Sequence, residues 1–139
     1  MRGCVCAVLA LLIAAQSQAA TLQTHLIRAS NETSKSDPQI KDLEVALRKQ
    51  FGYQHYQLLG VKSAALKISA PQRLELGEGF AMAVTPKGVD KKVHELAVEW
   101  ISGKTSLVRS TVKIAQDSHL FIKGPEVGND WIILALSVK

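Results

Sequence analysis

The sequence has only two cysteines, Cys4 and Cys6, and both lie at the very start of the 139-residue chain. A domain formed by the rest of the chain would contain no disulfide bond, no cysteine-based zinc site and no cysteine nucleophile. Aromatic residues are also scarce, at 5% of the chain, and they do not interleave with the basic residues. This arrangement argues against nucleic-acid binding.

Motifs that carry catalysis or hold a cofactor are also lacking. The four histidines do not lie at metal-ligand spacing on one helix, and no serine lies in the tight glycine-flanked turn of a serine hydrolase. Gly77-Glu78-Gly79 is a lone Gly-x-Gly between predicted strands, so it predicts a hairpin turn and not a phosphate-binding loop. We therefore expect no catalytic residue, no metal, no cofactor and a non-enzymatic function. The alternative is a small hydrolase whose site is built from dispersed residues.

The chain begins with a segment typical of a secretory signal peptide. Arg2 precedes an apolar stretch from Cys4 to Ala15, and Ser17-Gln18-Ala19 supplies small residues for cleavage. The stretch is shorter than the roughly 20 residues that span a bilayer. We predict a signal peptide over residues 1–20 and a single exported domain over residues 21–139, periplasmic or secreted, with no transmembrane segment after cleavage. An uncleaved membrane anchor is the alternative.

Basic residues outnumber acidic ones by 17 to 12, which gives a formal net charge of +5. Three of them, Lys87, Lys91 and Lys92, cluster in a predicted loop over Pro86–Lys92. Such a loop could contact anionic headgroups or acidic glycans. The alternative interpretation is a solvated hairpin tip.

One amphipathic helix is predicted from Pro38 to Phe51. Ile40, Leu43, Leu47 and Phe51 recur at steps of three or four residues and form one apolar stripe. Ser36 or Asp37 can cap the first turn, where Pro38 is tolerated. Gly52 follows at the position of a left-handed exit residue.

The remaining segments favour β-strands. Leu22–Ala29 and Tyr53–Val61 are suited to strands, and strict alternation marks strands with one buried face. The alternating segments are Ala64–Ser69, Arg73–Leu76, Phe80–Thr85, Glu95–Trp100 and Val108–Ile114. Trp131–Leu136 is continuously apolar and predicts a central strand covered on both sides. Pro86-Lys87-Gly88 is interpreted as a turn, and Lys123–Trp131 as a long loop.

These elements together predict a β-rich α+β domain. We expect an antiparallel meander that forms a sandwich or a partly open barrel, with the helix covering one side.

The densest aromatic stretch surrounds the helix exit. Tyr53, His55 and Tyr56 lie there, and Trp131 follows the predicted loop. Aromatic side chains with polar tips suit interfaces and sugar faces, so these residues are candidates for a binding surface. The alternatives are that Phe51 and one tyrosine anchor the helix to the sheet, and that Trp131 belongs to the core.

The segments that carry a resemblance are Leu26-Ile27-Arg28-Ala29, Phe51-Gly52-Tyr53 with Tyr56 and Leu58-Leu59, Gly124-Pro125, Gly128 and Trp131–Leu136. With them the chain resembles a set of short exported bacterial proteins to which no activity, cofactor or catalytic residue is attached. The resemblance implies a location in the Gram-negative periplasm.

By elimination, the sequence predicts a domain that works by binding. We expect an accessory part of a cell-envelope or secretion assembly with an envelope protein as its partner, because a β-meander offers sheet edges that a partner strand could extend. A small-ligand or glycan binder that uses Tyr53, Tyr56 and Trp131 is the alternative.

Overall fold

The computed structural model describes residues 20–32 and 37–139, which form eight strands, one α-helix and one short 3-10 helix. In chain order these are β1 (Thr21–Ser30), η1 (Pro38–Ile40), α1 (Lys41–Phe51), β2 (His55–Ala65), β3 (Gln72–Gly77), β4 (Phe80–Asp90), β5 (Val93–Ser102), β6 (Thr105–Ala115), β7 (His119–Val127) and β8 (Asp130–Val138). The predicted β-rich α+β class is confirmed. The predicted signal peptide lies outside the described residues, apart from Ala20.

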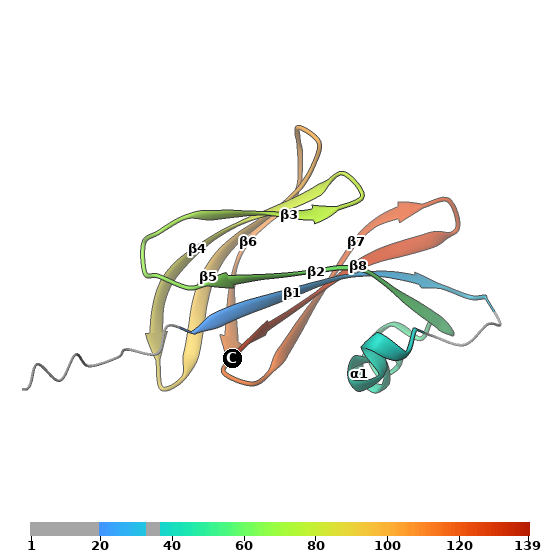
Figure 1. The fold of residues 1–139 in the computed structure, drawn as a ribbon, viewed down its shortest axis with the longest axis horizontal. Coiled ribbons are helices and arrows are strands. Elements are labelled where there is room, and N and C mark those ends of the chain that lie inside the picture. The colour runs from blue at the N-terminus through green and yellow to red at the C-terminus, as the bar shows by residue number, and fades with distance from the viewer. Residues whose placement is uncertain (1–19, 33–36) are drawn as a thin grey trace, which may run out of the picture.

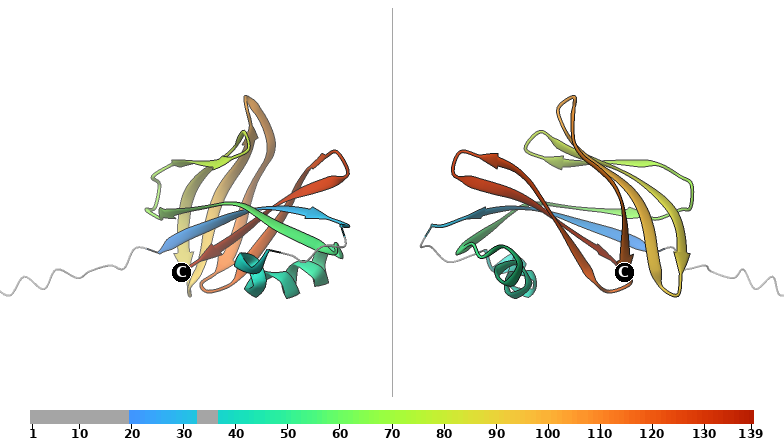
Figure 2. Two further views of the ribbon diagram at one scale, coloured as in Figure 1. Left: turned by 45° about the vertical axis from the view of Figure 1, so that its right-hand side comes forward. Right: turned by 180° about the vertical axis from the view of Figure 1, so that it is seen from behind.

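The strands form two antiparallel sheets of four. Sheet A has the order β2-β1-β8-β7, and sheet B has the order β3-β4-β5-β6. Each strand pairs with a neighbour in sequence, and β1 also pairs with β8. The two sheets pack face to face as an open sandwich (Figures 1 and 2). The predicted sandwich of meandering strands is therefore confirmed.

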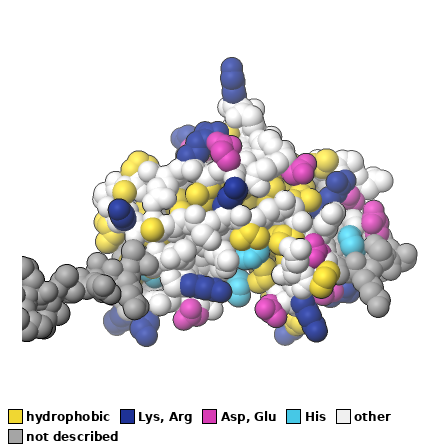
Figure 3. All heavy atoms as spheres, in the orientation of Figure 1, with side chains coloured by type: hydrophobic (Ala, Val, Ile, Leu, Met, Phe, Trp, Pro, Cys, Tyr) yellow, Lys and Arg dark blue, Asp and Glu magenta, His cyan; other side chains and the backbone are white. Residues whose placement is uncertain are grey.

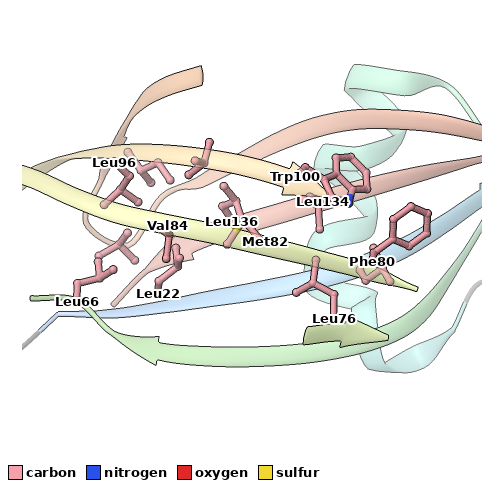
Figure 4. Packing of buried hydrophobic residues seen from close by; sticks show 14 of the residues in the cluster. Leu22, Leu66, Leu76, Phe80, Met82, Val84, Leu96, Trp100, Leu134 and Leu136 are labelled. Carbon is pink, nitrogen blue, oxygen red and sulfur yellow. The ribbon is translucent and has the colours of Figure 1, made fainter. Parts of the chain in front are cut away.

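The main core lies between the two sheets. Side chains from both sheets point toward one another there (Figure 4). The buried members are Leu22, Leu26, Leu66, Leu76, Phe80, Met82, Val84, Leu96, Val98, Trp100, Ile114, Ile132, Leu134, Leu136 and Val138. Phe80 and Trp100, with ring centroids 5.7 Å apart, lie at the end of this core that is far from Leu22.

The helix forms a second layer on the outer face of sheet A. Its buried residues pack on Ile133 and Ala135 of β8. The Asp37 side chain accepts a hydrogen bond of 2.9 Å from the Gln39 N–H. Gly52 ends α1 with a φ of 75° and donates its N–H to the Arg48 carbonyl. The predicted exit glycine is confirmed. Asp37 and Pro38 begin the 3-10 turn η1, so the first turn of the predicted helix is 3-10, and α1 itself begins at Lys41 without a side-chain cap. Ser36, the other predicted cap, lies outside the described residues.

Strand β8 is covered on both faces, as its continuous apolar run predicts. Ile132, Leu134 and Leu136 face the core between the sheets, whereas Ile133 and Ala135 belong to the cluster under the helix. Like β1, strand β8 is paired on both edges, and all its residues from Ile132 to Val138 are buried.

The prediction of a long loop over Lys123–Trp131 is wrong. Strand β7 continues to Val127, and the turn to β8 is made by Gly128 and Asn129. Gly124-Pro125 lies inside β7, where the pairing register shifts between Lys123 and Glu126. An edge strand tolerates proline at such an irregularity, because no partner needs the missing N–H.

Two further boundaries differ from the predictions. Pro86-Lys87-Gly88 is not a turn but a register shift within β4, which runs on to Asp90. The alternation over Ala64–Ser69 does not extend β2, which ends at Ala65. There the chain leaves sheet A for sheet B through a turn in which the Ala70 N–H donates to the Lys67 carbonyl.

Candidate functional site

The inward face of β1 ends in two polar residues. Side chains alternate along a strand, so Leu22, Thr24, Leu26, Arg28 and Ser30 share one face. The two leucines belong to the core between the sheets. Arg28, which lies opposite Ile132 of that core, and Ser30 come next along the strand and are not among the members of the core. The last two inward positions of β1 are therefore polar.

A small polar pocket lies at this end of sheet A. The register places His55 opposite Ser30 and Gln57 opposite Arg28 on β2. On the other side, the pairing of Ala29 with Trp131 brings Asp130 of β8 beside them. The pocket has a volume of about 180 Å³. Its lining residues are Arg28, Ser30, Glu32, His55, Gln57 and Asp130.

Two of the lining residues, Arg28 and Asp130, form an ion pair. The Arg28 Nε lies 2.6 Å from the Asp130 Oδ2, and the two side chains are 43% and 17% exposed. The pair joins the end of β1 to the start of β8 and fixes the direction of the guanidinium. Only Nε is engaged within the described residues, so the two terminal nitrogens of Arg28 can reach a further acceptor.

The Ser30 side chain forms part of the pocket lining and is buried. The residue is 3% exposed, and its Oγ has no hydrogen-bond partner within the described structure. A buried hydroxyl without a partner is unusual, because its desolvation is not offset by a new hydrogen bond. Thr24 and Ser137 also have buried, unpartnered hydroxyls, but neither lines this pocket.

Two of the predicted aromatic residues meet on the opposite face of sheet A. The Lys123 Nζ lies 4.0 Å from the centroid of the Trp131 ring and 5.4 Å from that of Tyr53. A cation over a ring is attracted to its π-face. One face of each ring therefore already has a protein partner. Lys123, which the sequence did not single out, is the residue that unites the pair.

Tyr56 is buried and anchors the helix instead of lining a surface. It is 0% exposed, its hydroxyl donates to the Leu47 carbonyl at 3.1 Å, and the Tyr53 N–H donates to that hydroxyl at 3.1 Å. Burial raises the pKa of the Tyr56 hydroxyl, and the hydrogen bond from Tyr53 opposes the shift in part. Of the two interpretations given for this tyrosine, the structure favours the anchor.

The three predicted lysines lie far from the aromatic residues. Lys91 and Lys92 form the two-residue turn between β4 and β5, with φ values of 49° and 64°. Glycine and asparagine normally occupy such left-handed positions. Lys87 lies on the same hairpin at the irregularity in β4. The hairpin and α1 occupy opposite ends of the molecule (Figures 1 and 2).

The outer face of sheet B carries two shallow grooves with charges of both signs. One of about 500 Å³ is lined by Gly88, Val89, Asp90, Lys91, Val93, Glu95 and Lys113. The other, of about 570 Å³, is lined by Ala83, Thr85, Lys87, Ala97, Val98, Glu99, Arg109, Ser110 and Thr111. On the face drawn in Figure 3, basic side chains are interspersed with acidic ones and do not gather into one patch.

The residues predicted for a binding surface therefore fall into separate places. Tyr53 and Trp131 lie together on the helix side of sheet A, while His55 lines the polar pocket. Sequence reasoning missed Arg28, Ser30 and Asp130. The only signal was Arg28, a polar residue within the predicted strand Leu22–Ala29. Ser30 lay outside that prediction, because the strand was expected to end at Ala29 and β1 continues to Ser30.

His25 makes stability depend on pH. Burial lowers its pKa below the ordinary value of 6.5, and the nearby charges of His119 and Lys139 lower it further. Its Nδ1 is buried and has no hydrogen-bond partner in the part of the chain that the structure describes. Since the unfolded chain then binds more protons, the free energy of unfolding should fall as the pH drops below 6.5 and level off below the folded-state pKa.

His25→Gln should remove this part of the pH dependence, and His119→Gln should reduce it. Urea denaturation at about pH 7.5 and about pH 5 measures both effects. An unchanged difference between the two pH values in His25→Gln would refute the assignment.

Comparison of the chain with family models, curated proteins and solved structures finds no match. Among residues 20–32 and 37–139, no three or more histidine, cysteine or acidic side chains are grouped so that they could hold a metal ion. In the same part of the chain, no helix is long and apolar enough to span a membrane.

Proposed function

We propose that the chain is an exported accessory domain that binds a protein of a cell-envelope or secretion assembly, through the edge of strand β6. The observation that carries the proposal is the length and openness of this edge. β6 has eleven residues and, within the described structure, pairs only with β5. An unpaired edge offers backbone N–H and C=O groups to an added strand.

The other edges are less suited to strand addition. β3 has six residues, and β7 is interrupted by Gly124 and Pro125. β2 is irregular in its pairing and approaches β3 so closely that a Cβ on Gly60 would lie 2.7 Å from the Leu76 carbonyl oxygen. By contrast, the β5–β6 hairpin projects from the molecule, and the N-terminal half of β6 stands clear of β7 (Figure 2).

The side chains of β6 suggest the chemistry of the partner strand. Val108 and Val112 are half-buried at the rim of the core, so an added strand could complete their burial. Arg109 and Lys113 are exposed on the outer face, and β6 contains no acidic residue. Like charges disfavour self-pairing of such an edge. The expected partner segment therefore alternates apolar and acidic residues.

Site-specific photo-crosslinking from β6 tests this proposal. A photoreactive residue at Thr111, exposed on the outer face of β6, should crosslink in the native envelope to one protein, through an extended segment rich in acidic residues. The matched position is Ser63, exposed on β2 at the far edge of the other sheet. Crosslinking from Ser63 should be at least about tenfold weaker.

A double charge reversal, Arg109→Glu with Lys113→Glu, should lower the Thr111 crosslinking yield by about tenfold, because it repels an acidic strand. Arg109 forms an exposed ion pair with Glu99 of β5 at 3.1 Å, and the loss of such a pair costs about 1 kcal/mol or less, so the circular dichroism spectrum should be unchanged. Equal yields from Thr111 and Ser63, or a yield unaffected by the charge reversal, would contradict the proposal. Crosslinking to no protein at all would also contradict it.

A further inference from the structure

The polar pocket at the end of sheet A has the features of a ligand site that is separate from the β6 edge. It joins side chains from three adjacent strands, and its volume of about 180 Å³ is below the range of about 300–1,000 Å³ that holds drug-sized ligands. A ligand that fits it has only a few non-hydrogen atoms. The lining is almost wholly polar, so that ligand must itself be polar.

The donors in the pocket suit a carboxylate. The ion pair with Asp130 fixes Arg28 through Nε and leaves its terminal nitrogens, which can bind the two oxygens of a carboxylate. The Ser30 hydroxyl is buried in the same lining without a partner. A bound oxygen would satisfy both groups. Gln57, opposite Arg28 in the register, brings an amide N–H as well.

The acceptors in the pocket suit an ammonium group. Glu32 and Asp130 both line it, and Asp130 is only partly neutralised by its single contact with Arg28. A simple anion would meet these two carboxylates without compensation, which disfavours it. A molecule that carries both charges satisfies the donors and the acceptors together.

We propose that this pocket binds a small zwitterion with one carboxylate and one ammonium group, of the size of glycine or alanine. The carboxylate is held by Arg28 and Ser30, and the ammonium group lies toward Glu32 and Asp130. The unpartnered Ser30 hydroxyl is then a ligand contact, and its desolvation is offset when the site is filled.

Titration of the folded domain with glycine, followed by backbone amide NMR shifts, tests the proposal. Glycine should shift the amides around Arg28, His55 and Asp130 in a saturable way. Acetate and methylamine each carry one of the two charges, so each should bind at least about tenfold more weakly. Phenylalanine should be excluded by the volume of the pocket.

Ser30→Ala separates a ligand role from a structural one. Because the hydroxyl has no partner among the described residues, its removal should leave the thermal midpoint unchanged or raised. The same change should weaken glycine binding by about tenfold and reduce the rise in midpoint that glycine produces. Ser137→Ala is the matched control, because Ser137 is equally buried and unpartnered but lies outside the pocket.

Three results would overturn the inference. They are an absence of saturable shifts with glycine, binding of acetate or methylamine as strong as that of glycine, and glycine binding that Ser30→Ala leaves unchanged. None of these three results tests the proposal for the β6 edge, because the crosslinking experiment probes a strand of the other sheet.

Discussion

Gly124→Ala should lower the free energy of unfolding by about 3 kcal/mol or more, at the upper end of the range for overpacked sites. A Cβ on Gly124 would lie 2.0 Å from the Trp100 Cη2 and 2.2 Å from its Cζ3. Trp100 is 1% exposed and packs on Phe80, so its ring has no free space into which to move. Thermal or urea denaturation measures the loss.

The cause can be isolated with a control and a compensating change. Gly88→Ala should cost little, because nothing lies within 4 Å of the position of its Cβ. Trp100→Phe replaces the indole by a smaller ring, which does not reach as far toward the methyl group that Gly124→Ala adds. In that background Gly124→Ala should cost at least about 1.5 kcal/mol less than in the parent, which is the signature of a direct contact. Additive costs would show that the clash is not the cause.

The helix could be predicted from the sequence because its signals are local. The cap at Asp37, the proline after it, the apolar stripe and the exit glycine all lie within one short segment and agree with one another. The central strand β8 was also predictable, because a continuous apolar run requires cover on both faces.

Strand β7 could not be predicted, because the reason for its composition lies in another strand. Gly124 and Pro125 normally indicate a loop. In the structure the glycine makes room for Trp100 of β5, and the proline lies on an edge where its missing N–H is not needed. Neither condition can be recognised until the two sheets are packed together.

The candidate site was only partly predictable for a similar reason. Tyr53 and Trp131 stand out as aromatic residues beside turns, but Lys123 joins them only through the pairing of β7 with β8. The polar pocket depends on the order β2-β1-β8, which brings the far ends of the chain together. Strand order is not determined by alternation, so Ser30 and Asp130 had no visible relation in the sequence.

Leu47→Ala should cost about 2–5 kcal/mol, the second large effect that we expect. Leu47 is 0% exposed and lies in the cluster between α1 and sheet A with Leu43, Tyr56, Ile133 and Ala135. Truncation leaves a cavity at the centre of this layer. The Tyr56 hydroxyl donates to the backbone carbonyl of Leu47 and does not need the leucine side chain, so the loss of stability reports packing alone.

Val45→Ala on the same helix is the matched control. Val45 is 68% exposed, and alanine has the higher helix propensity, so the change should be within about 0.5 kcal/mol of neutral. Because α1 packs on sheet A alone, Leu47→Ala should reduce the hydrogen-exchange protection of α1 more than that of β4 and β5. A parallel loss in both regions would mean that the helix is an inseparable part of the main core. Equal effects of the two substitutions would mean that the apolar stripe does not hold α1 on the sheet.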